Sequence, residues 1–311
     1  MGPVGFYKWI REEHGYVGAQ VYVSARHRLL VDAKALMYRF AYGIPIDSLN
    51  YHQDVVNVLV ARFGHFAHVT FINDGQVNKE HPKYETDCKR GVQRAKQRDA
   101  VETSAKRIKL SEEAFLVCPL NAEEEGKLDK EVEKLDRAAR AARGISYSDS
   151  LKIMNLLEAL PNFSCIQCEK GEADHLLIRM AASYDFVISE DGDLLCGGIT
   201  NLLRGFATPD QLLYNAADIL ATLNLTLTQL QEIVCISGND YRRTKIPKMG
   251  LKKAYDFIHK HGSCESMIQK WNKKERKTFK LPPNFQQELT KACLLYNPKA
   301  TFIVAEQQEI E

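Results

Sequence analysis

Short runs of β-branched and aromatic residues recur along the chain, and acidic residues follow each of them. The runs are RLLV (28–31), HVTFIN (68–73), FSCIQC (163–168) and DFVISE (185–190). Runs of this kind, separated by helical patterns, are typical of buried strands in a mostly parallel α/β sheet flanked by helices. In that architecture a ligand binds beyond the carboxyl ends of the strands, and the acids of this chain fall there.

Apolar residues at helical spacing fill most intervals between these runs. Residues 33–43 and 54–64 are two such segments, and each stops at a glycine. A third helix is predicted over 171–184, with Glu172 and Asp174 in its first turn. The positive end of the helix dipole would keep both carboxylates ionised there.

Residues 76–143 break this alternation, because they are polar and first basic, then of mixed charge. Within them, 122–143 carries acid–base pairs at i,i+4 spacing, which predicts an exposed helix. An amphipathic helix at 146–161 then leads back to the third strand. We therefore expect 76–150 to be a helical insertion that separates two parts of one core, 1–75 and 151–225.

Residues 226–262 predict a helix–turn–helix unit, with a first helix that begins at a threonine cap and a second that ends at Gly262. The turn and the second helix are rich in basic residues that suit a phosphate backbone: Arg242, Arg243, Lys245, Lys248, Lys252 and Lys253. A helical tail, 263–311, follows, with one helix expected at 285–296.

The composition of the chain is that of a globular protein. The chain has 311 residues, of which 45% are hydrophobic and 26% charged, so disorder and fibrous repeats are excluded. It has no apolar run of 18 residues and no signal-peptide core, so we expect no membrane span and an intracellular protein with eight reduced cysteines. The pair Cys165 and Cys168 has no second pair at metal-binding spacing.

The net charge is only +2, yet basic residues gather in two blocks. Residues 79–110 hold ten lysines and arginines, Arg94 among them, against five acids, and 242–260 hold seven against Asp256 alone. The blocks indicate two contact surfaces for a polyanion, or else two solvated helix faces.

Seven acids stand out as candidate metal ligands: Asp32, Asp74, Glu172, Asp174, Asp191, Asp193 and Asp240. Gathered in one crevice, they would repel one another unless divalent cations offset their charge. Carboxylates suit Mg²⁺, and two such ions can activate a water and stabilise the leaving oxygen of a phosphodiester. A lone acid after a strand is usually structural, but seven in this arrangement favour a site.

The ordered motifs resemble the flap endonuclease family of structure-specific 5′ nucleases, which includes the xeroderma G-type repair nucleases. The resemblance runs from MGPVGFYKWI to about residue 300. It rests on LLVDAKALMYRF with Asp32, FINDG with Asp74, GEADHLLIRMA with Glu172 and Asp174, ISEDGDLLCGG with Asp191 and Asp193, and ISGNDY with Asp240. It implies a PIN-like nuclease core.

The resemblance also implies roles for individual residues. The insertion would be a helical arch that places Lys83 and Arg90 at the scissile phosphate, with Lys79 or Lys89 and Arg94 as alternatives. Tyr38 would stack on a substrate base. The helix–turn–helix unit would hold duplex DNA through a K⁺ ion, although its turn reads PKMG where the family has a Gly-Ile-Gly run.

The expected activity is Mg²⁺-dependent hydrolysis of branched or 5′-ended DNA, with a 5′-phosphate product. Mn²⁺ could replace Mg²⁺. The protein would be a nuclear or cytoplasmic monomer, and it shows no box for a sliding clamp at its end, AEQQEIE. Two alternatives stay open: an endoribonuclease of the same fold, resembling herpesvirus host-shutoff proteins, and a non-catalytic nucleic-acid-binding scaffold.

Overall fold

A computed structural model describes most of the chain. The described residues are 5–45, 48–75, 84–115, 122–169, 171–206, 208–238, 244–294 and 296. Internal contacts divide the chain into two compact units. The sheet unit comprises Met1–Ala33, His65–Gly75 and Asn162–Glu311, and the helical unit comprises Lys34–Gly64 and Gln76–Pro161. The domain boundaries expected from the sequence stay predictions.

The sheet unit is built on six strands in the order β3-β2-β1-β4-β5-β6. The strands are β1 (Arg28–Asp32), β2 (His68–Asn73), β3 (Phe163–Gln167), β4 (Phe186–Ile188), β5 (Leu202–Arg204) and β6 (Leu212–Tyr214). All neighbouring pairs are parallel except β5 and β6. The predicted mostly parallel α/β fold is thus confirmed. Strands β5 (Leu202–Arg204) and β6 (Leu212–Tyr214) were not predicted from the sequence.

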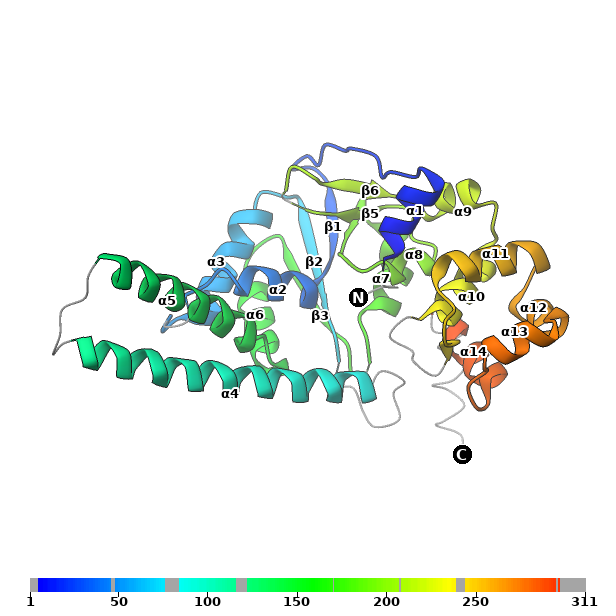
Figure 1. Cartoon of the computed structure of the whole chain (residues 1–311). Helices are drawn as coiled ribbons and strands as arrows, with labels where there is room; N and C mark the ends of the chain where they lie inside the picture. Colours follow the sequence, from blue (N-terminus) through cyan, green and yellow to red (C-terminus); the bar gives the residue numbers. More distant parts are fainter. Residues whose placement is uncertain are drawn as a thin grey trace, which may run out of the picture. The chain divides into compact units, whose positions relative to one another are not determined.

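Helices of the sheet unit precede and follow these strands (Figure 1). They are α1 (Phe6–His14), α7 (Asp174–Met180), the 3₁₀ helix η1 (Ala181–Ser183), α8 (Asp193–Cys196), α9 (Ala216–Leu223), α10 (Leu227–Ser237), α11 (Leu251–His261), α12 (Cys264–Lys270), α13 (Lys273–Thr278) and α14 (Phe285–Leu294). As predicted, Thr226 caps α10 and Gly262, with a φ of 85°, ends α11.

One predicted helix is shorter than expected. The interval 171–184 was predicted to be helical, but α7 begins only at Asp174, so Glu172 lies before the helix rather than in its first turn. Gly171 has a φ of 77°, a left-handed conformation that a right-handed helix does not include. At the other end, residues 181–183 tighten into η1.

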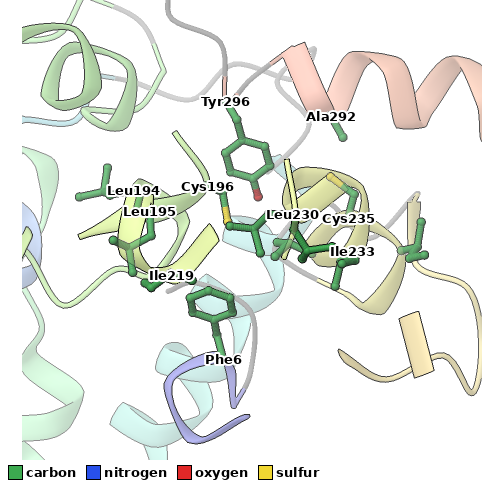
Figure 2. Packing of buried hydrophobic residues seen from close by; sticks show 14 of the residues in the cluster. Phe6, Leu194, Leu195, Cys196, Ile219, Leu230, Ile233, Cys235, Ala292 and Tyr296 are labelled. Atoms are coloured by element: carbon green, nitrogen blue, oxygen red, sulfur yellow. The ribbon is translucent and has the colours of Figure 1, made fainter. Parts of the chain in front are cut away.

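A buried cluster in the sheet unit joins helices that are far apart in sequence. Figure 2 shows Phe6, Cys196, Cys235 and Tyr296 among the side chains of this cluster. They come from α1, α8, α10 and the turn after α14. Because interiors are close-packed, this cluster holds α8 and its acidic N-terminus in a defined position.

The helical unit contains α2 (Ala33–Ala41, its first residue in the sheet unit), α3 (Tyr51–Phe63), α4 (Tyr84–Phe115), α5 (Ala122–Arg143) and α6 (Tyr147–Glu158). Helices α4 and α5 pack together, as do α3 and α6. The predicted i,i+4 pairs are present on α5, where Arg137 Nη2 lies 3.1 Å from Glu133 Oε2.

Within the described residues, no single helix is both long and apolar enough to cross a membrane. Helices α9 and α10 reach such a length and composition only as a pair, and they meet at an angle of 84°.

Candidate active site

The strand order places the acids at one edge of the sheet. From β1 the chain proceeds to β2 and β3 on one side, and then returns to β4 on the other side of β1. The gap between β1 and β4 is therefore the topological switch point, where open α/β sheets bind ligands. Acids follow each of the four adjacent strands β3, β2, β1 and β4, whose ends span roughly 15 Å at ordinary strand spacing.

Asp32, the last residue of β1, is linked across the switch point to the segment after β4. Ser189 Oγ donates to Asp32 Oδ2 (2.7 Å) and accepts from the backbone N–H of Asp191 (3.0 Å). The N–H of Asp193 in turn donates to Asp191 Oδ1 (2.9 Å). One hydroxyl thus connects the acid of the first motif with the acids of the fourth. Asp32 is 8% exposed and Asp193 3%.

Two uncharged residues of this network were missed from the sequence. Ser189 stands at the carboxyl end of β4, and that position was its only signal. The second is Tyr296, whose hydroxyl donates to Asp193 Oδ1 (3.0 Å) from 103 residues further along the chain. No local pattern marked Tyr296.

Asp74 is held by the segment that leads into α7. The backbone N–H of Ala173 donates to Asp74 Oδ1 (2.8 Å), and the N–H of Gly75 donates to the carbonyl of Gly171 (2.8 Å). The amide of Gln167 donates to the carbonyl of Asp74 (2.6 Å). These bonds tie the ends of β2 and β3 together and place Asp74 beside the acidic stretch 172–174.

The thiol of Cys168 lies close to the carboxylates of Asp74 and Asp174. Burial first, and then the charges of Asp74 and Asp174, raise the pKa of Cys168 to about 11. Both carboxylates therefore lie near one buried sulfur. The thiol stays protonated at neutral pH, which makes Cys168 a poor nucleophile.

Helix α1 lies against the loop that carries Asp191 and Asp193. A Cβ added at Gly192 would meet the Tyr7 ring at 3.2 Å, so the ring would have to shift by a few tenths of an ångström to admit a side chain there. The guanidinium of Arg204 stacks on the same ring, 3.4 Å from its centroid, and its Nη2 lies 3.1 Å from Glu190 Oε2. Tyr7 and Arg204 were also not found from the sequence.

Candidate residues of the helical unit form a separate group. The Tyr38 hydroxyl donates to the carbonyl of Ile145 (2.9 Å) and accepts from Arg94 Nη1 (2.9 Å). The Arg94 guanidinium lies 5.7 Å from the Tyr38 ring centroid. Lys83 lies outside the described residues, and so does the side chain of Arg90.

The basic residues of the helix pair α10 and α11 are described only in part. Asp240, Arg242 and Arg243 lie outside the described residues, whereas Lys245, Lys248, Lys252 and Lys253 lie within them. Lys252 forms an ion pair with Glu13 of α1, which raises the pKa of Lys252.

The donors along this edge are oxygens, which suit a hard divalent cation such as Mg²⁺. In the part of the chain that the structure describes, no three acidic, histidine or cysteine side chains form a ready-made metal-binding group. The six described acids share one edge of the sheet but do not converge on one point.

Known proteins resemble the chain in sequence. No protein-family profile matches it. Flap endonuclease 1 of Enterocytozoon bieneusi is 38% identical over 89 residues, 27% of this chain and 25% of that protein. The enzymes of that name from Methanocaldococcus jannaschii and Glycine max are 24% and 26% identical over 143 and 147 residues, 44% and 46% of this chain. The matches span 44% and 36% of those two proteins, less than half of each.

Solved structures share the fold. The catalytic core of Rad2 in complex with DNA substrate aligns with a TM-score of 0.59 at 17% identity, over 95% of this chain and 81% of that one. The flap endonuclease of Methanococcus jannaschii aligns with a TM-score of 0.53 at 14% identity, over 88% and 78% of the two chains. The resemblance drawn from the sequence motifs is confirmed.

Proposed function

We propose that this chain, which is related to the flap endonuclease family of 5′ nucleases in sequence and in fold, hydrolyses phosphodiester bonds in branched or 5′-ended DNA. One observation carries the proposal: acids follow the carboxyl ends of four adjacent parallel strands, on both sides of the switch point. The Rad2 core, which shares the fold, is in complex with a DNA substrate. We place the action of the protein inside the cell, at nuclear DNA.

The acids would hold two Mg²⁺ ions, which Mn²⁺ could replace. Asp32, Asp74, Glu172 and Asp174 would serve one ion, and Asp191, Asp193 and Asp240 the other. These acids suit Mg²⁺ because the ion takes oxygen ligands. It also keeps several waters, so a carboxylate can hold it through a water molecule. When bound, such ions lower the pKa of a coordinated water and stabilise a leaving oxygen.

The neutral partners of these acids would set the direction in which each carboxylate points. Ser189 orients Asp32, the Ala173 N–H orients Asp74, and Tyr296 orients Asp193, each through a hydrogen bond of 2.7 to 3.0 Å. Such outer contacts position metal ligands and tune their affinity. The burial of Asp32 and Asp193 adds to the need for an opposite charge nearby.

Basic and aromatic residues would bind the substrate. Lys83 and Arg90 would stabilise the negative charge that develops on the phosphate, and Tyr38 would orient the nucleotide. Arg94, Arg242, Arg243, Lys245, Lys248, Lys252 and Lys253 would contact the phosphate backbone. Binding of a K⁺ ion by the loop of the helix–turn–helix unit, and a monomeric state, belong to the same proposal.

The test is cleavage of end-labelled 5′-flap DNA by the wild-type protein and by Asp191→Asn, in Mg²⁺ and in chelator. We expect cleavage only in Mg²⁺, with a rate at least about 100-fold lower for the variant, because a lost metal ligand removes several kcal/mol of transition-state stabilisation. Asp210→Asn, which changes an exposed acid in the turn before β6, is the matched control.

Unchanged cleavage by Asp191→Asn would show that the acids are not the active site. An unpaired RNA of equal length, assayed in parallel, decides the substrate class: preference for it would replace DNA with RNA in the proposal. Binding of both nucleic acids without cleavage of any would favour a scaffold.

A further inference from the structure

A further basic surface follows the helix pair α10 and α11 in the chain. Residues 270–280, KWNKKERKTFK, contain six basic residues and a single acid, and they were not among the basic blocks predicted from the sequence. They end α12, form α13 and continue for two residues. The α12–α13 surface is defined here by its five lysines: Lys270, Lys273, Lys274, Lys277 and Lys280.

The lysines of the α12–α13 surface are available to a ligand. All five are exposed, and none takes part in an ion pair within the described part of the chain. The one acid, Glu275, is used locally: its Oε2 accepts from the backbone N–H of Asn272 (2.8 Å) as half of a capping box. A positive charge is therefore concentrated here, and within the described residues no acid pairs with it.

The backbone beneath these lysines is anchored to α11. The Phe279 ring lies 5.7 Å from Trp271 and 5.8 Å from Phe257, which belongs to α11. Arg276 Nε donates to the carbonyl of Trp271 (3.0 Å), so the only arginine of the segment is a structural residue. Trp271 and Phe279, which flank α13, are both buried. Their burial fixes α13 to the rest of the sheet unit.

The surface continues the basic residues of α11. Lys253 Nζ lies 5.9 Å from the Phe279 ring centroid, which places a lysine of α11 beside the last part of the α12–α13 surface. Helices α11, α12 and α13 lie together at one end of the sheet unit (Figure 1). A polyanion that contacts α11 could therefore extend along α13.

We propose that the α12–α13 surface binds the phosphate backbone of a nucleic-acid duplex and lengthens the contact begun by α10 and α11. The inference rests on the proposed function. The chemistry favours phosphates over bases, because lysines are flexible point charges and the aromatic rings of the segment are buried rather than offered for stacking. Recognition would be independent of sequence and sensitive to salt.

The test compares two triple variants with equal loss of charge. Lys273→Gln, Lys274→Gln and Lys277→Gln together neutralise the surface, while Lys8→Gln, Lys152→Gln and Lys291→Gln remove three scattered exposed charges as the matched control. Binding to a DNA duplex of about 30 base pairs is measured without a divalent cation over a range of salt concentrations. Loss of three phosphate contacts should make the slope of log affinity against log salt shallower by about 2 to 3 units. The control variant should keep the wild-type slope.

Equal slopes for the two variants would overturn the inference. Circular dichroism and the thermal midpoint establish that both variants fold as the wild type does. If the variant of the α12–α13 surface does not fold, the charge-preserving substitutions Lys273→Arg, Lys274→Arg and Lys277→Arg should keep the wild-type slope. The proposed function fails separately: an absence of Mg²⁺-dependent cleavage by the wild-type protein would leave the slope difference intact.

Discussion

At the scale of single residues, the acidic edge depends on neutral groups as much as on carboxylates. Ser189 both donates to Asp32 and accepts from the N–H of Asp191, so one hydroxyl sets the relation between the first and fourth motifs. It is 1% exposed, which means that water cannot replace it. This contact ties the Asp32 carboxylate to the backbone of Asp191.

The substitution Ser189→Ala should therefore raise the Mg²⁺ concentration needed for half-maximal cleavage by about 10- to 100-fold, as the loss of outer-shell contacts does in metal sites. Titration of Mg²⁺ against cleavage rate measures the effect. Ser183→Ala, at an exposed serine of η1, is the control. An unchanged Mg²⁺ dependence would mean that the Asp32 carboxylate is oriented by other groups.

At the scale of elements, Tyr38 and Arg94 connect two helices of the helical unit. The Tyr38 hydroxyl joins α2 to Arg94 of α4 and to the carbonyl of Ile145 before α6. Through these two hydrogen bonds, Tyr38 holds α4 near Arg94 against α2. Its proposed contact with a nucleotide would then use the ring while the hydroxyl stays bonded.

Tyr38→Phe keeps the ring and removes both hydrogen bonds, which are worth about 1 to 2 kcal/mol together. Amide exchange in α4 around Arg94 should become roughly 5- to 30-fold faster. Hydrogen–deuterium exchange read by mass spectrometry measures the change, with Tyr42→Phe, at a half-exposed tyrosine one turn along, as the control. Equal exchange in the two variants would show that the hydroxyl does not hold α4.

At the scale of the whole molecule, six acids lie along one edge of the sheet, and a divalent cation bound there, as we propose, would stabilise the folded state. Mg²⁺ should raise the thermal midpoint of the wild-type protein, because a ligand at 100 times its dissociation constant contributes about 2.7 kcal/mol. The double variant Asp32→Asn and Asp191→Asn should lose most of this increase. Scanning calorimetry in MgCl₂, and in KCl of equal ionic strength, separates binding from screening, and equal shifts in wild type and variant would contradict the site.

The sequence by itself determined the parts of the protein that depend on near neighbours. Strands β1 to β4 follow from short apolar runs, and α10 begins at Thr226 because a threonine side chain caps the N–H groups of the next turn. The order of the acidic motifs also lies in the sequence, and it carries the resemblance to flap endonucleases.

Only the tertiary structure decided which groups meet at the acidic edge. Ser189 and Asp32 are 157 residues apart, and Tyr296 and Asp193 are 103 apart, so no local pattern records their contacts. The β5–β6 pair and the attachment of α13 to α11 have the same cause. Periodicity and capping report interactions within a few residues, whereas packing between distant segments selects its partners by shape and hydrogen bonding in the folded chain.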